Sequence, residues 1–82
     1  MVETDARSLV DIVSEVFELD PNELDDDTSP DNTTAWNSLS AVRLVVVLQE
    51  TFDIEFKNSE ILAMRSIALI RRVLRKRGIS IA

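Results

Sequence analysis

Apolar residues return every three or four positions in three stretches of this chain, the spacing of an α-helix that is buried along one face. The stretches span Ala6–Phe17, Ser38–Phe52 and Ile67–Leu74. Polar and apolar residues alternate only over residues 53–56, and four residues without a partner strand cannot form a stable sheet. The spacing therefore predicts an all-α fold, a small bundle of three to four helices in which a short segment ending at Met64 is the fourth.

Residues that cap helices stand near the ends of these stretches. Thr4 or Asp5 can cap the first helix, and Pro21 limits its far end because the residue before a proline is pushed out of the α region. The remaining expected caps are Asn37 for the second helix, Asn58 or Ser59 for the short one and Ser66 for the last, with Gly78 as the C-terminal stop.

A long acidic loop is expected between the first and second helices, over residues 20–37, which are rich in Asp, Asn, Ser, Thr and Pro. Leu24 is its main apolar anchor, and Trp36 stands near its end. The acidic run Asp25–Asp27 invites comparison with a calcium loop, but the turn glycine and the twelfth-position Glu of an EF-hand are both missing. We expect a solvated loop and no metal site.

The helix over residues 38–52 carries apolar residues on two sides. At 100° per residue, one face gathers the expected core residues Ala41, Leu44, Val45, Leu48 and Phe52. The second face carries Leu39, Val46 and Val47 beside Ser40, Arg43 and Glu50, with Val42 on the boundary. This second face is either a surface for a partner or a set of scattered exposed aliphatics, which are common on protein surfaces.

The composition excludes several classes of chemistry. The chain has no cysteine and no histidine, so a disulfide scaffold, a zinc cage and a His-activated nucleophile are all absent. Gly78 is its one glycine, which rules out a glycine-rich phosphate loop. With 82 residues, the chain is expected to form a single domain over 1–82 that is not an enzyme.

No segment suits a membrane or a secretory signal. The longest apolar run, Leu44–Leu48, has five residues, whereas a spanning helix needs roughly 20. Residues 1–7 contain two acids and no apolar core of a signal peptide. We expect a cytoplasmic, monomeric protein, and the initiating Met1 with a full set of helices indicates a free-standing one.

Charge divides the chain unevenly. Residues 1–37 carry a formal charge of −10 and residues 38–82 carry +4, for a net charge of −6. An acidic protein repels nucleic acid and anionic membranes and suits a partner with a basic docking face. A nucleic-acid patch is the alternative for the basic cluster, but no aromatic residue accompanies it, and a solvated helix end is favoured. The cluster comprises Arg71, Arg72, Arg75, Lys76 and Arg77.

Ser38 stands at the first turn of the second predicted helix. Unpaired backbone N–H groups and the positive end of the helix dipole favour a phosphate there. A phosphodiester formed on the Ser38 hydroxyl would lie in that field. Since serine is common at helix starts for structural reasons, a purely structural role is the alternative.

Asn37-Ser38-Leu39 resembles the Asp-Ser-Leu motif of the acyl carrier protein family, whose serine carries a 4′-phosphopantetheine arm. The first helix, the acidic loop and the run over residues 44–56, with its Phe-x-Ile-x-Phe ending, are also similar, so the likeness covers nearly the whole chain. The resemblance implies covalent 4′-phosphopantetheine on Ser38, flanked by Asn37 and Leu39, and thioester-bound acyl cargo. It also implies a phosphopantetheinyl transferase and acyl-loading and acyl-processing enzymes, of ketosynthase, acyltransferase or ligase type, as partners.

In that family the second helix is the main docking element. The resemblance therefore implies that partners contact Trp36, Leu39, Ser40, Val42, Arg43, Val46, Val47 and Glu50. Asn37 replaces the usual Asp, which implies slower modification or a tolerant transferase. Arg43 stands at a position that is often acidic in fatty-acid carriers, and Trp36 is closer to discrete carriers of polyketide and other specialised pathways. An aminoacyl or peptidyl carrier, and a small helical interaction module without a prosthetic group, are the alternatives.

Overall fold

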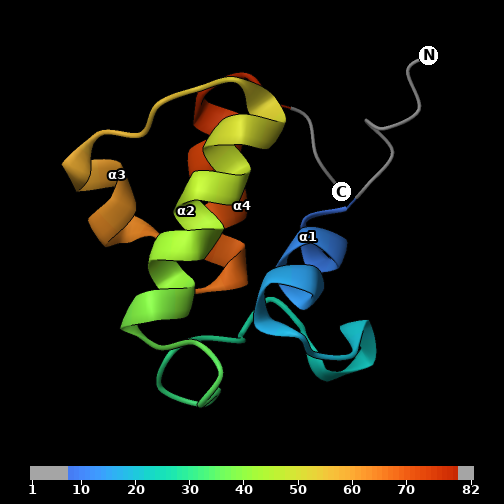
Figure 1. Ribbon diagram of the computed structural model, residues 1–82. Coiled ribbons are helices and arrows are strands. Elements are labelled where there is room, and N and C mark those ends of the chain that lie inside the picture. Colours follow the sequence, from blue (N-terminus) through green and yellow to red (C-terminus); the bar gives the residue numbers. More distant parts are fainter. Residues whose placement is uncertain (1–7, 80–82) are drawn as a thin grey trace.

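The computed structural model describes residues 8–79, and every regular element in that range is a helix (Figure 1). The prediction of an all-α bundle is therefore confirmed. The elements are helix α1 (Leu9–Phe17), the 3₁₀ helix η2 (Pro21–Glu23) and helices α2 (Ser38–Phe52), α3 (Asn58–Ala63) and α4 (Ile67–Lys76). None of these helices is both long enough and apolar enough to cross a bilayer.

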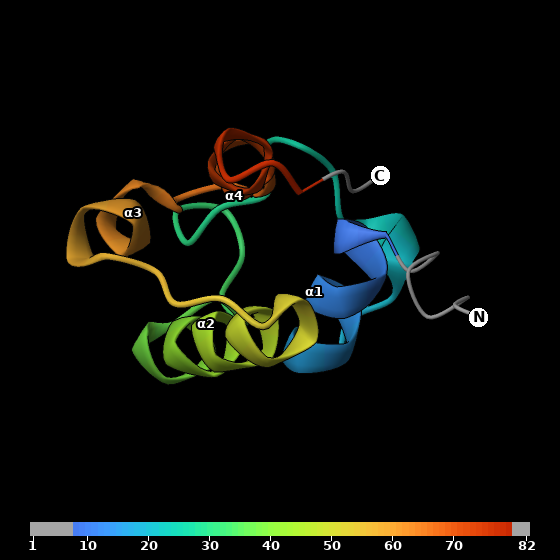
Figure 2. The same ribbon diagram turned by 90° about the horizontal axis from the view of Figure 1, so that it is seen from above.

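Three helices enclose the core. Seen from above, α2 and α4 lie on opposite sides of the molecule, α1 closes one end between them and α3 lies at the other (Figure 2). α1 contacts α2 and α4, and α3 contacts α4. The side chains with almost no exposure are Leu9, Ile12, Val13, Leu48, Ile67, Ile70 and Leu74. On the predicted inner face of α2, Leu44 and Leu48 are buried, and Ala41, Val45 and Phe52 are partly buried.

The helix caps agree with the predictions at α2 and α4. Asn37 caps α2, and the Ser66 Oγ accepts the N–H of Leu69 at 3.1 Å in α4. Gly78 has a φ of +83°, the left-handed conformation that glycine adopts without strain after a helix. The arrangement stops α4 where the sequence placed its end.

Two predicted caps were wrong. α1 begins at Leu9 because the Ser8 Oγ accepts the N–H of Asp11 at 3.1 Å, whereas the predicted cap residues 4 and 5 lie outside the described residues, as does residue 6. α3 is preceded by Lys57, whose N–H donates to the Glu60 carboxylate at 2.8 Å. This bond draws Asn58 into the first turn of the helix.

The loop between α1 and α2 is more ordered than predicted. Asp20 caps η2 by accepting the N–H of Asn22 at 2.8 Å, so part of the loop is helical. Leu24 is buried, as predicted, and so is Thr28. The carbonyls of Thr28 and Asp26 accept the N–H groups of Ile67 and Ala68 at 3.2 and 3.1 Å. The loop thus supplies hydrogen-bond acceptors to the first turn of α4, where N–H groups have no partner within the helix.

Candidate functional site

The start of α2 is held by a reciprocal pair of hydrogen bonds. The Asn37 Oδ1 accepts the N–H of Ser40 at 3.0 Å, and the Ser40 Oγ accepts the N–H of Asn37 at 2.9 Å. The Ser40 hydroxyl also donates to the carbonyl of Ala35 at 2.6 Å. These bonds form a capping box, which fixes the direction in which the chain enters the helix.

Ser38 is the first residue of α2, and its side chain is exposed. Within the described part of the chain, its hydroxyl takes part in no hydrogen bond. The N–H of Ala41 makes the first bond along the helix, to the carbonyl of Asn37 at 2.8 Å, and the N–H of Ser40 is capped. The N–H groups of Ser38 and Leu39 are left to face outward. An accessible hydroxyl therefore stands at the positive end of a helix dipole, with no acid in the first turn.

A groove opens beside Ser38. Its volume is about 430 Å³, and it runs from the end of the loop across the start of α2 to α3. The lining residues are Pro30, Trp36, Asn37, Ser38, Ala41, Ile61, Leu62, Met64 and Arg65. The groove is large enough for an extended substituent on the Ser38 hydroxyl, so the residues present fit a phosphate-linked arm at this position.

An apolar cavity of about 210 Å³ lies between α2, α3 and α4, next to the groove. Its lining residues are Trp36, Ala41, Val42, Leu44, Val45, Val46, Ile61, Met64 and Ile70. Four of them, Trp36, Ala41, Ile61 and Met64, also line the groove. The cavity was not predicted from the sequence, because α3 forms one of its walls and the position of so short a helix depends on the rest of the fold.

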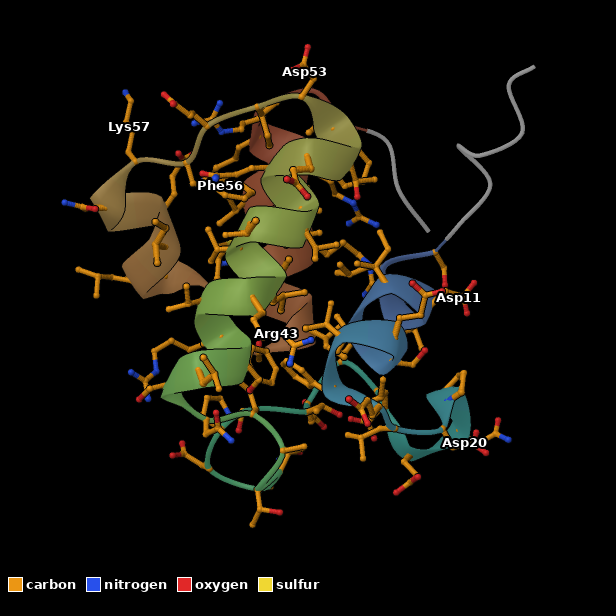
Figure 3. The ribbon with its side chains drawn as sticks, in the orientation of Figure 1. Asp11, Asp20, Arg43, Asp53, Phe56 and Lys57 are labelled. Atoms are coloured by element: carbon orange, nitrogen blue, oxygen red, sulfur yellow. The ribbon has the colours of Figure 1, made fainter. Side chains whose placement is uncertain are left out.

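The outer face of α2 consists of Leu39, Val42, Arg43, Val46 and Glu50, which project within about 100° of one another. Leu39, Val42 and Val46 are 70%, 62% and 44% exposed, and both charged residues are exposed. Figure 3 shows Arg43 on the side of α2 that faces away from α4. On α3, Leu62 is 75% exposed and lines the groove beside Ser38, which the sequence did not predict.

Two residues predicted to contact partners lie inside the protein. Trp36 is 4% exposed, with its ring centroid 5.2 Å from that of Phe17. Ser40 is 8% exposed because its hydroxyl turns back into the capping box. Val47 is partly buried against the core. The predicted docking surface is therefore smaller than expected, and it lacks the side chains of Trp36 and Ser40.

An ion pair fixes α3, which forms the far wall of the groove. The Arg77 guanidinium donates from Nε and from one terminal nitrogen to the two Glu60 carboxylate oxygens, at 2.9 and 2.6 Å. These hydrogen bonds lower the pKa of Glu60 from 4.5 to about 2, and they raise the pKa of Arg77. Arg77 also lies 5.5 Å from the centre of the Phe56 ring, a cation–π distance. α3 is thus tied to the end of α4.

Two of the five residues of the basic cluster form ion pairs with acidic side chains. Arg77 binds Glu60, and Arg71 forms an ion pair with Asp26 of the loop. Arg72, Arg75 and Lys76 remain on the solvent side of α4.

Near the acidic run, the Asp25 carboxylate accepts the N–H of Asp27 at 2.9 Å. Within residues 8–79, no group of three or more acidic side chains suits a metal ion.

Comparison with known proteins gives one assignment. No curated protein matches the chain, but the family model described as the phosphopantetheine attachment site matches residues 7–74. The match includes every residue that lines the Ser38 groove, and it covers α1, η2, α2 and α3 in full and α4 as far as Leu74. Domains of this kind carry covalently attached 4′-phosphopantetheine, are generally non-catalytic, and interact with a modifying transferase and with acyl-processing enzymes. The chain belongs to the phosphopantetheine attachment family and is a phosphopantetheine carrier protein.

Proposed function

We propose that this carrier is an acyl carrier protein and that the Ser38 Oγ is the atom to which 4′-phosphopantetheine is attached. The observation that supports this assignment is the exposed Ser38 hydroxyl, without a hydrogen-bond partner among the described residues, at the N-terminus of a fifteen-residue helix. The other serine of the same turn, Ser40, is buried in the capping box and cannot serve.

The residues around Ser38 prepare the position for a phosphodiester. The side chains of Asn37 and Ser40 form hydrogen bonds with each other's backbone N–H groups, so neither side chain occupies the position of the phosphate. The N–H groups of Ser38 and Leu39 face the place where its oxygens would lie. The bound arm ends in a thiol that carries acyl groups as thioesters, so the chain itself needs neither Cys nor His.

The apolar cavity under α2 supports an acyl cargo over an aminoacyl one. All nine lining residues are apolar, so a charged ammonium group would lose its hydration there without gaining a partner. An aliphatic chain would instead remove apolar surface from water. The alternative cargo is tested by asking whether adenylating enzymes specific for amino acids load the modified protein.

The outer face of α2 is the proposed contact for the transferase and for enzymes of ketosynthase, acyltransferase or ligase type. Arg43 gives it a cation, and Asn37 removes an acid from its edge. Enzymes that present basic patches to acidic carriers are poorly matched to it. A polyketide or other specialised pathway is therefore proposed, with the protein acting as a single-domain monomer in the cytoplasm.

Incubation with coenzyme A, Mg²⁺ and a broad-specificity phosphopantetheinyl transferase tests the attachment atom. Intact mass should rise by one phosphopantetheine in the wild type and stay unchanged in Ser38→Ala. Ser59→Ala is the matched control, because Ser59 is also an exposed serine in the first turn of a helix. Modification of Ser38→Ala would refute the assignment, and an unmodified wild type beside a modified control carrier would favour the unmodified interaction module.

A further inference from the structure

We propose that the Arg65 guanidinium forms an ion pair with the phosphodiester on Ser38 and so holds the base of the arm in the groove. Arg65 lies outside the Asn37-Ser38-Leu39 motif and is twenty-seven residues away from Ser38 along the chain. The inference rests on the attachment at Ser38 proposed above, and it adds a residue from the segment between α3 and α4 to the binding site of the arm.

The groove brings the two residues together. Ser38 and Arg65 both line it, Ser38 from the start of α2 and Arg65 from the junction between α3 and α4. Arg65 is the sole cation among the lining residues, and none of them is acidic. A phosphodiester built on Ser38 would enter a groove that contains one positive charge and no negative charge of its own.

The backbone of Arg65 is fixed on both sides. Met64 is buried at 8% exposure, and Ser66 caps α4 through its bond to Leu69. The N–H of Arg65 itself donates to the carbonyl of Ala63 at 3.0 Å. The Cα of Arg65 is therefore held at the edge of the groove, and only the exposed side chain has freedom to adjust.

The Arg65 side chain has no ion-pair partner in the described part of the chain. Arg71 and Arg77, by contrast, are paired with Asp26 and Glu60. An arginine that is free to bind can offer two parallel N–H groups to phosphate oxygens, the geometry for which the guanidinium is best suited.

The charge distribution of the chain explains why a cation near Ser38 would stabilise the attached phosphate. Residues 1–37 carry a charge of −10, and the loop that ends at Asn37 belongs to them, so a new negative charge at Ser38 would be repelled. Asn37 in place of an acid reduces this repulsion, and Arg65 opposes it directly. Both features act on the phosphate that the arm brings.

A thermal cycle tests the pair. Apo and fully modified forms of the wild type, Arg65→Gln and Arg72→Gln are prepared, conversion is confirmed by intact mass, and the melting temperature is measured for each. Arg72 is the matched control because it is an exposed arginine of α4 that lines a different groove. An exposed ion pair in a domain of this size corresponds to about 1–5 °C.

The melting temperature of the modified form minus that of the apo form should be higher by about 1–5 °C in the wild type and in Arg72→Gln than in Arg65→Gln. Arg65→Lys should retain most of the effect, and 1 M NaCl should remove most of it because the pair is exposed to solvent. Equal changes in wild type and Arg65→Gln would overturn the proposal, as would an equal loss in Arg72→Gln.

NMR of the wild type gives a second measurement that needs no variant. The Nε–Hε signal of Arg65 should shift when the apo form is converted to the modified form, while that of Arg72 stays in place. An unmoved Arg65 signal in fully modified protein would overturn the ion pair alone. Absence of any gain in mass would overturn the attachment at Ser38 and the ion pair with it, so the two failures are distinguishable.

Discussion

At the start of α2, the hydroxyl of Ser40 accepts the N–H of Asn37 and donates to the carbonyl of Ala35. Ser40→Ala removes both bonds at a position that is 8% exposed, and should destabilise the fold by about 1–2 kcal/mol. Urea unfolding followed by the fluorescence of Trp36, the one tryptophan, measures the loss. Ser59→Ala, at an exposed position, should change stability by less than about 0.5 kcal/mol, and similar midpoints for the two variants would contradict the role given to Ser40.

Replacing Asn37 by Asp changes the charge at the start of α2 and keeps a residue that can cap the helix. Asn and Asp cap helices about equally well, so Asn37→Asp should leave the urea midpoint within about 0.5 kcal/mol of the wild type. The added carboxylate restores the acid found in the motif that the sequence resembles, and should raise the initial rate of phosphopantetheine transfer, measured by intact mass against time. Asn58→Asp places the same charge at the start of α3 and should leave that rate unchanged. Equal rates for all three proteins would show that the transferase does not read this charge.

The position of Ser38 was predictable from the sequence, but the orientation of its neighbours was not. A helical projection gives the direction of each Cα–Cβ bond and takes no account of hydrogen bonds at the helix start. Ser40 therefore projected outward on the wheel, while its hydroxyl turns back to Asn37. Trp36 precedes the helix, so no periodicity applied to it, and it fills space against Phe17.

At the scale of the element, the two faces of α2 make different contributions. Leu44 is 3% exposed, and Leu44→Ala should destabilise the fold by about 2–5 kcal/mol. Leu39 is 70% exposed, so Leu39→Ala should change stability by less than about 0.5 kcal/mol. The same urea assay measures both substitutions, each of which removes the same atoms. A loss above 2 kcal/mol for Leu39→Ala would place that side chain in the core.

The ion pair between α3 and α4 makes stability depend on pH in a defined window. Because the pKa of Glu60 falls from 4.5 to about 2 in the folded state, its stabilising contribution is present above pH 4.5 and is lost as the pH falls towards 2. Glu60→Gln should flatten the dependence of melting temperature on pH between those limits. Glu50→Gln, on the outer face of α2, should retain the wild-type dependence. A carboxyl carbon of Glu60 that titrates near 4.5 by NMR would refute the shift.

Sequence periodicity found α2 and α4 within two residues of their observed ends, since both are long enough to show a repeating face. α3 has six residues and shows no such repeat, so its place beside Ser38 could not be predicted. Ile61, Leu62 and Arg65, which complete the groove, depend on that placement. α3 is held in this place by tertiary contacts such as the ion pair between Arg77 and Glu60, which the sequence pattern does not reveal.

At the scale of the molecule, the acidic loop and the basic helix α4 are parts of one structure. Asp26 binds α4 twice, through its carbonyl to the N–H of Ala68 and through its carboxylate to Arg71. Thr28 adds a bond from its carbonyl to the N–H of Ile67. The opposite charges of the two halves of the sequence are thus brought into contact, and the loop that leads to Ser38 is supported by the far side of the molecule.

Hydrogen exchange tests this support, because the amides of Ile67 and Ala68 exchange only when the loop leaves α4. Arg71→Gln keeps the backbone bonds and removes the ion pair, whose Asp26 side chain is 64% exposed. An exposed pair of this kind should speed exchange at those two amides by about two- to fivefold. Arg75→Gln removes a cation from the same helix without a described partner, and should leave both rates unchanged. Equal exchange in both variants would mean that the backbone bonds alone hold the loop, and a rise confined to Arg71→Gln would show that charge attraction between the two halves does part of that work.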